Sequence, residues 1–284
     1  MLSLFTTFYT DKSPVRQKEL EYCLSNNLEN ELIDRVCILT ESPDCLPFDN
    51  AKIKLIKTNN RPFFKELVEA SNLMNSCSDM SIIANSDIHF DKSLSSLSEF
   101  EMDKTVLCLN RWDVLSNGNL RPFNSFFSSD TWVFQGEIKV RLSENYHLGQ
   151  PACDNRFNYD LFKSNYQILN PAFTIRTFHV HASEIRSYTE ITSSVKSVSR
   201  PYFFVPLDYT MQDRMQKPNI RAQLKRLYHY NRFTLNRQIL LNRLKAEDYH
   251  PYSSSRLAAL MRCLWHFNYL RKKSDFEFSP GSFA

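Results

Sequence analysis

Short apolar runs alternate with longer amphipathic stretches along the first 110 residues of the chain. The short runs are rich in branched and aromatic residues, which is typical of strands, and they cover residues 2–9, 34–39, 52–56, 81–84 and 105–109. Helical spacing and capping residues predict helices over residues 13–26, 62–74 and 93–100. This alternation predicts an α/β fold, with a doubly wound, mixed but mainly parallel sheet and helices on both faces.

The pattern changes after Trp112. Shorter strand-like runs follow, with polar and Ser/Thr-rich segments around them, at residues 131–134, 149–158, 173–178 and 187–199. From about residue 218 the spacing predicts two basic helices. We therefore expect a sheet domain over residues 1–210 and a basic helical C-terminal appendage over residues 211–284.

The charge of the chain is unevenly distributed. Residues 211–273 hold 14 Lys/Arg and 3 Asp/Glu, whereas the whole chain has a net charge of only +4. The appendage is therefore a solvated helical hairpin, a module for an anionic membrane surface, or a nucleic-acid binder. Nucleic acid is the least favoured partner because no recognised nucleic-acid-binding module is present.

Composition excludes several classes of site. Glycine occurs only 4 times, and neither phosphate-binding glycine motif, G-x-x-x-x-G-K-[ST] or G-x-G-x-x-G, is present. The 7 cysteines show no C-x-x-C spacing, which favours buried thiols in a reducing compartment. The N-terminus lacks signal-peptide features and no run reaches the length of a membrane span. We expect a cytoplasmic protein, and peripheral binding to the inner face of a membrane is compatible with the same features.

The strand that opens at Ser81 ends in Asn85-Ser86-Asp87. In open α/β sheets ligands bind at the carboxyl ends of the strands, so these side chains are candidates for a divalent-cation site. The alternative is an Asx turn in which Asp87 and Asp91 cap the helix that begins near Ser93.

Further polar clusters follow in a fixed order. The motifs are N-S-D-I, N-R-W-D, S-x-D-x-W-V-F, G-x-P-x-C-D-N-R, N-P-x-x-x-I and H-x-H-x-S-x-x-R-x-Y. In this order they resemble a group of glycosyltransferase-like proteins with the GT-A, nucleotide-diphospho-sugar transferase fold. The resemblance covers about residues 2–190 and leaves the appendage outside.

The resemblance implies a metal site for Mn²⁺ or Mg²⁺ on the donor diphosphate. Its Asp-x-Asp motif corresponds to Asn85-Ser86-Asp87, so that Asp87 is the principal ligand and Asn85 departs from the pattern. A late histidine of such enzymes corresponds to His179 or His181. For either histidine, a packed or surface role is the alternative.

The resemblance also implies a catalytic carboxylate at Asp154, which would take the proton of the acceptor hydroxyl. Its alternative role is to cap a helix over residues 155–163.

Donor and acceptor contacts complete the expected site. Those expected on the donor side are Thr6, Thr7, Tyr9, Arg61, Ser86 and Arg111, and those on the acceptor side are Asp130, Trp132 and Asn155. For Arg61 the alternative is a solvated residue at a helix start, for Arg111 an ion pair with Asp113, and for Trp132 a place in the core.

The sequence thus predicts a metal-dependent, inverting glycosyltransferase. It would move a sugar from a nucleotide-diphosphate donor to a glycan or lipid-linked acceptor in surface polysaccharide synthesis. A nucleotidyltransferase is disfavoured because residues 6–16 contain no glycine. The other alternative is a non-catalytic nucleotide-sugar or glycan-binding module on a degenerate transferase fold, as Asn85 in place of the first Asp suggests.

Overall fold

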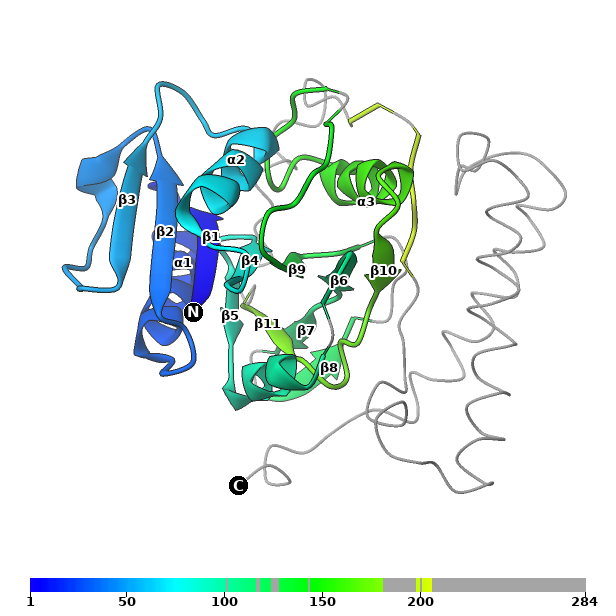
Figure 1. Cartoon of the computed structure of the whole chain (residues 1–284). Coiled ribbons are helices and arrows are strands. Elements are labelled where there is room, and N and C mark those ends of the chain that lie inside the picture. Colours follow the sequence, from blue (N-terminus) through cyan, green and yellow to red (C-terminus); the bar gives the residue numbers. More distant parts are fainter. Residues whose placement is uncertain are drawn as a thin grey trace, which may run out of the picture.

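The computed structural model describes residues 1–100, 102–115, 118–123, 128–142, 144–180, 198–199 and 201–205. Within them lies a seven-stranded sheet of order β10-β6-β9-β4-β1-β2-β3 (Figure 1). Its strands are β1 (Leu2–Thr7), β2 (Arg35–Thr40), β3 (Ile53–Lys57), β4 (Met80–Ala84), β6 (Thr105–Leu109), β9 (Thr131–Gln135) and β10 (Gln167–Leu169). Every neighbouring pair in this sheet is parallel except the two that β9 makes, with β4 and with β6. The predicted mixed, mainly parallel sheet is therefore confirmed.

A second, four-stranded sheet has the order β5-β11-β7-β8. Its strands are β5 (Ile88–Phe90), β7 (Trp112–Val114), β8 (Leu120–Pro122) and β11 (Thr177–Val180). β5, β7 and β8 were not expected, because strands of three residues are too short to show an alternating pattern.

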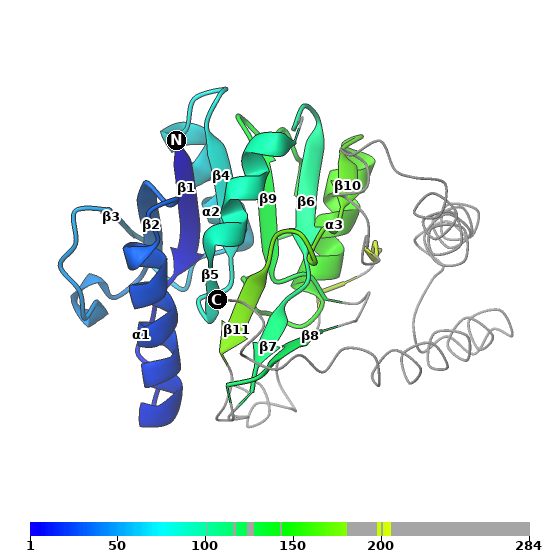
Figure 2. The same cartoon turned by 90° about the horizontal axis from the view of Figure 1, so that it is seen from below.

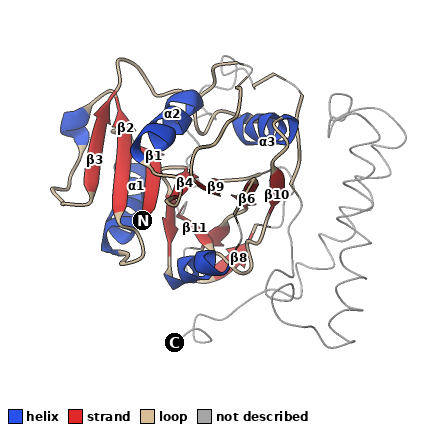
Figure 3. Cartoon of the chain, viewed as in Figure 1, coloured by secondary structure: helices blue, strands red, loops and turns tan. Residues whose placement is uncertain are grey.

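Helices cover both faces of the large sheet, as predicted (Figures 2 and 3). The helical segments are α1 (Pro14–Glu29), the 3₁₀ turn η1 (Pro43–Cys45), α2 (Phe64–Met74), the 3₁₀ segment η2 (Lys92–Glu99) and α3 (Cys153–Lys163). One face packs on α1 and η2 through residues such as Leu20, Leu24 and Leu94. The other packs on α2 and α3 through Phe64, Leu67 and Phe157.

Most helix boundaries agree with the sequence pattern. Ser13 caps α1, its hydroxyl accepting from Arg16 N–H, and Pro14 is the first helical residue. Asp91 caps η2 through Ser93 N–H, as the sequence suggested, whereas Asp87 takes no part in that cap. Leu73 is 86% exposed, because α2 turns Leu67, Val68 and Ser71 toward the core.

The predicted appendage over residues 211–284 lies outside the described residues. In the described part of the chain, no helix has the length and apolar character needed to cross a bilayer. The six cysteines described there are free, and Cys37 and Cys108 are buried core residues, as expected.

Candidate active site

The candidate site lies at the carboxyl edge of the large sheet, where the chain reverses its direction of strand addition. From β1 the chain adds β2 and β3 on one side, and β4 then pairs on the opposite side of β1. Such a switch point is where open α/β sheets bind ligands. Residues 85–87 link β4 to β5, and Asn110 and Arg111 link β6 to β7, so each of these two linkers leaves the large sheet at this edge.

Asp87 is the centre of one half of the site. Its Oδ2 accepts a hydrogen bond of 2.5 Å from Arg16 Nη2, in the first turn of α1, and lies 3.2 Å from His179 Nε2 on β11. The Asp87 and Arg16 side chains are only 13% and 7% exposed. Arg16 is also paired with Glu19 at 3.0 Å, so the buried charges alternate in sign.

Arg111 is the centre of the other half. Its Nε donates to Asp113 Oδ1 at 2.9 Å, and its Nη1 lies 3.3 Å from both carboxylate oxygens of Asp130. Asn85 and Ser128 also donate to the Asp130 carboxylate, at 3.0 and 3.1 Å. The alternative of an Arg111–Asp113 pair is thus present, and Asp130 shares the same guanidinium.

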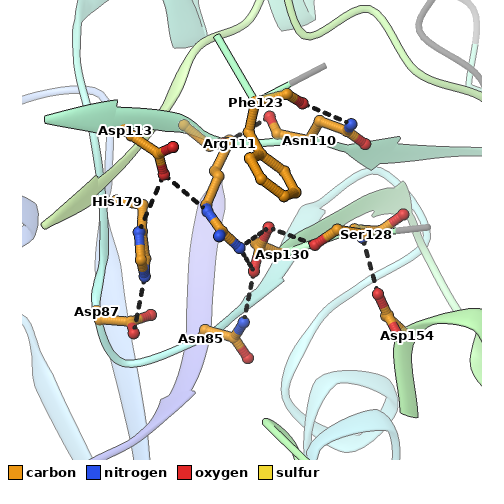
Figure 4. Close-up of polar contacts among 12 residues, drawn as sticks. Asn85, Asp87, Asn110, Arg111, Asp113, Phe123, Ser128, Asp130, Asp154 and His179 are labelled. Atoms are coloured by element: carbon orange, nitrogen blue, oxygen red, sulfur yellow. Dashed lines mark hydrogen bonds and ion pairs between the residues drawn. The ribbon is translucent and has the colours of Figure 1, made fainter. Parts of the chain in front are cut away.

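His179 joins the two halves, as Figure 4 shows: its ring stands between Asp87 and Asp113. Although burial works against the charged form, the two carboxylates raise the pKa of His179 to about 9. Burial likewise opposes ionisation of Asp87, yet His179 and Arg16 hold its pKa well below the ordinary value. His179 is therefore protonated and Asp87 ionised at neutral pH.

Asp154 differs from these carboxylates because no cation contacts it in the described part of the chain. Its Oδ2 accepts from Ser129 N–H at 3.1 Å and its Oδ1 from Asn155 Nδ2 at 3.0 Å (Figure 4 draws the first contact). Burial, with the nearby charge of Asp130, raises the pKa of Asp154 to about 7. A carboxylate that titrates near neutrality can act as a general base.

The alternative role predicted for Asp154, capping a helix over residues 155–163, is not what the structure has. α3 begins at Cys153 and its N-cap is Ala152, so Asp154 lies inside the first turn. Its side chain is directed to the loop before β9 instead.

The residues expected to hold a metal do not form a metal-binding set as they are arranged. Asp87 is occupied by Arg16 and His179, and Asn85 donates its amide to Asp130. Asp87 Oδ1 is buried and has no hydrogen-bond partner among the described residues. Across those residues no three His, Cys, Asp or Glu side chains form a group that could hold a metal ion. His181 lies outside the described residues. One neutralised carboxylate oxygen does not fit the several oxygen ligands of Mn²⁺ or Mg²⁺.

The expected donor contacts divide into three groups. Thr7 and Tyr9 at the end of β1, Ser86 in the β4–β5 linker and Arg111 are half-buried at the carboxyl edge. The expectation that Thr6 contacts the donor must be corrected, because Thr6 is buried and its hydroxyl donates to Ala84 O within the sheet. Arg61 is exposed and donates to Leu148 O at 2.9 Å, in the loop that precedes α3.

The expectation that Trp132 contacts the acceptor must also be corrected. Its side chain has no exposed area and its indole N–H donates to Asn158 Oδ1 at 2.9 Å, so its face cannot stack on a sugar. The sequence alternative, a core tryptophan, is confirmed. Asp130 and Asn155 are 5% and 7% exposed, and their side chains contact Arg111 and Asp154.

Arg16 is one residue of the candidate site that the sequence analysis missed. A signal was present, because arginine is unusual in the first turn of a helix, where the helix dipole disfavours a cation. Asn110 was also missed. Its side chain bonds Asn170 and Phe123 O, which fixes the β6–β7 linker beside Arg111.

No protein-family model matches the chain, and no curated protein is significantly similar to it. Several solved structures are similar to it at low scores. They include GalNAc-T7 with UDP, GalNAc and Mn²⁺ (TM-score 0.43, 7% identity, 64% of this chain and 43% of that one). LgtC has a TM-score of 0.33 and 11% identity, over 70% of this chain and 98% of its own. The inositol-1-phosphate CTP transferase from T. maritima has a TM-score of 0.35 and 12% identity, over 68% of this chain and 96% of its own. At such scores these matches do not by themselves assign a fold or a reaction.

Proposed function

We propose that this chain is an inverting glycosyltransferase that moves a sugar from a nucleotide-diphosphate donor to a hydroxyl of a glycan or lipid-linked acceptor. The observation that carries the proposal is the position of Asp154. It is a half-buried carboxylate with a pKa of about 7, held by Ser129 N–H at the switch-point edge, beside a cluster that contains Arg111.

The proposed reaction is a single displacement. The acceptor oxygen attacks the anomeric carbon of the sugar, and the bond from that carbon to the diphosphate oxygen breaks. The nucleoside diphosphate leaves with the electron pair, and the acceptor proton passes to Asp154. Because the acceptor oxygen attacks directly, without a covalent intermediate on a protein carboxylate, the configuration at the anomeric carbon inverts.

Arg111 is the proposed contact for the leaving diphosphate. A guanidinium forms charge-assisted hydrogen bonds with phosphate oxygens, and Arg111 is anchored by Asp113 and Asp130 in the linker that faces the same edge. Thr7, Tyr9 and Ser86 are proposed for the rest of the donor. A surface polysaccharide as product, and a lipid-bound acceptor reached through the basic appendage, are part of the same proposal.

The test is release of nucleoside diphosphate from a panel of nucleotide sugars, with and without Mn²⁺, first without and then with candidate acceptors. We expect Asp154→Asn to lower transfer by about 100-fold or more, the usual contribution of a general base. Transfer by the unaltered protein should rise with pH through about 7, because the base must be deprotonated. Full activity of Asp154→Asn with acceptor, or a flat pH profile, would refute the assignment.

A second candidate is a non-catalytic nucleotide-sugar or glycan-binding module. It is favoured by the engagement of Asp87 with Arg16 and His179 and by Asn85 in place of an aspartate. Binding of a nucleotide sugar without any release of nucleoside diphosphate, in the presence of acceptors, would favour this candidate.

A further inference from the structure

Arginine occupies the position that a metal would need at Asp87. Arg16 and Asp87 are buried together, and the guanidinium contacts Oδ2 directly. Because guanidinium keeps its proton at any physiological pH, Arg16 is a permanent cation at this carboxylate. A divalent ion at Asp87 would have to approach a buried positive charge at close range, which is strongly unfavourable in a low-dielectric interior.

The replacement of the expected first aspartate by Asn85 has a physical reason in the structure. Asn85 Nδ2 donates to Asp130 Oδ1 at 3.0 Å, and Asn85 N–H itself bonds Asp130 O. An aspartate at this position would place two carboxylates within hydrogen-bond distance and would lose the donor. Asn85 is therefore matched to Asp130 and makes the site one charge less anionic.

Arg111 supplies a second permanent cation at the same edge, and its geometry leaves a donor for a ligand. Nε and Nη1 hold Asp113 and Asp130, while Nη2 has no hydrogen-bond partner among the described residues. The side chain is 18% exposed, and its guanidinium lies over the Phe123 ring at 4.2 Å, which fixes its plane.

We infer that Arg16, by occupying Asp87, makes this a metal-independent site, in which the donor diphosphate is held by guanidinium through Arg111. This inference rests on the proposed function for the identity of the ligand. Its metal part rests only on the Arg16–Asp87 and Asn85–Asp130 contacts.

The first experiment measures the binding of UDP, GDP, CDP and ADP by isothermal titration calorimetry, in EDTA and in Mn²⁺. We expect the nucleotide that binds to have the same affinity within about 3-fold in both buffers. Arg111→Gln should weaken its binding by about 10-fold or more in both, as loss of a charge-assisted contact predicts. The matched control, Arg141→Gln, alters an exposed arginine outside the site and should leave binding unchanged.

The second experiment follows free Mn²⁺ by electron paramagnetic resonance while protein is added. The unaltered chain should leave the signal unchanged, whereas Arg16→Gln, which releases the Asp87 carboxylate, should bind Mn²⁺ measurably. If Arg16→Gln does not fold, nucleotide binding by the unaltered chain in EDTA and in Mn²⁺ still tests whether the site depends on a metal.

Two outcomes would overturn the inference. One is nucleotide binding that Mn²⁺ strengthens by more than 10-fold and EDTA abolishes. The other is stoichiometric Mn²⁺ binding by the unaltered chain. If no nucleotide binds in either buffer, the proposed function fails, and the Mn²⁺ titration alone decides the metal part.

Discussion

Asp130 and Asp154 lie at the same edge of the sheet, but their hydrogen-bond partners differ, and so does their capacity to take up a proton. Asp130 accepts hydrogen bonds from Arg111, Asn85 and Ser128. Asp154 accepts from Ser129 N–H and from the Asn155 side-chain amide, and no cation contacts it in the described part of the chain. A carboxylate without a cationic partner keeps its proton to higher pH, so Asp154 is the one suited to proton transfer.

The raised pKa of Asp154 predicts a measurable link between pH and stability. The folded chain binds this proton up to about pH 7, while the unfolded chain releases it near pH 4. Stability contributed by Asp154 is therefore present at low pH and lost as the pH rises from about 4 to about 7. The melting temperature of Asp154→Asn, relative to that of the unaltered chain, should therefore rise between pH 5 and pH 8.

An unchanged difference in melting temperature between the two chains across that range would contradict the raised pKa. Asp34→Asn alters an exposed carboxylate that accepts a hydrogen bond from Leu2 N–H, and it is a control for general effects of removing a carboxylate.

At the scale of elements, the start of α3 sets the direction of Asp154. The N-cap residue, Ala152, has a φ of 68°, in the left-handed region that residues with a side chain rarely adopt. This turn lets α3 begin at Cys153 and directs Asp154 toward Ser129. Backbone strain of this kind often occurs at functional sites.

Replacing Ala152 by glycine should therefore stabilise the fold, by about 1 kcal/mol, because glycine adopts a positive φ without strain. Urea denaturation measures the change. Ala70→Gly, within α2, is the matched control and should instead destabilise by about 1 kcal/mol. A loss of stability in Ala152→Gly would show that the left-handed turn is not a source of strain.

At the scale of the whole molecule, the charged cluster also fastens separate parts of the fold together. Arg16 is on α1, Asp87 is in the β4–β5 linker, and His179 is on β11 of the second sheet. The same contacts that define the site thus connect the first helix to both sheets.

Removing one partner of the buried Arg16–Asp87 pair should be costly. Asp87→Asn is expected to lower the free energy of unfolding by about 3 kcal/mol, since it removes one of the two carboxylates, Asp87 and Glu19, that neutralise the buried Arg16 guanidinium. The double variant Arg16→Gln/Asp87→Asn should lose less than the sum of the single changes, because the two residues interact.

Glu69→Gln serves as the control for this pair, since it breaks an exposed contact with Lys65 on α2 and should change stability by less than about 0.5 kcal/mol. Additive losses in the double variant would mean that Arg16 and Asp87 do not support each other.

Six of the seven strands of the large sheet, all but β10, could be predicted from local sequence pattern. Short apolar runs and helix caps such as Ser13-Pro14 act over a few residues, so they predicted β1 to β4, β6, β9 and the helical segments α1, α2 and η2. The polar ends of β4 and β6 also marked the edge at which the site lies.

Which polar residues meet depends on the tertiary fold, because the partners are far apart in the chain. Arg16 and Asp87 are 71 residues apart, and Asp87 and His179 are 92 apart. For the same reason, the local sequence pattern did not establish that Trp132 is buried or that the Thr6 hydroxyl donates to Ala84 O within the sheet. Burial and charge pairing depend on the whole fold, and because of them Asp87, expected as a metal ligand, forms an ion pair with Arg16.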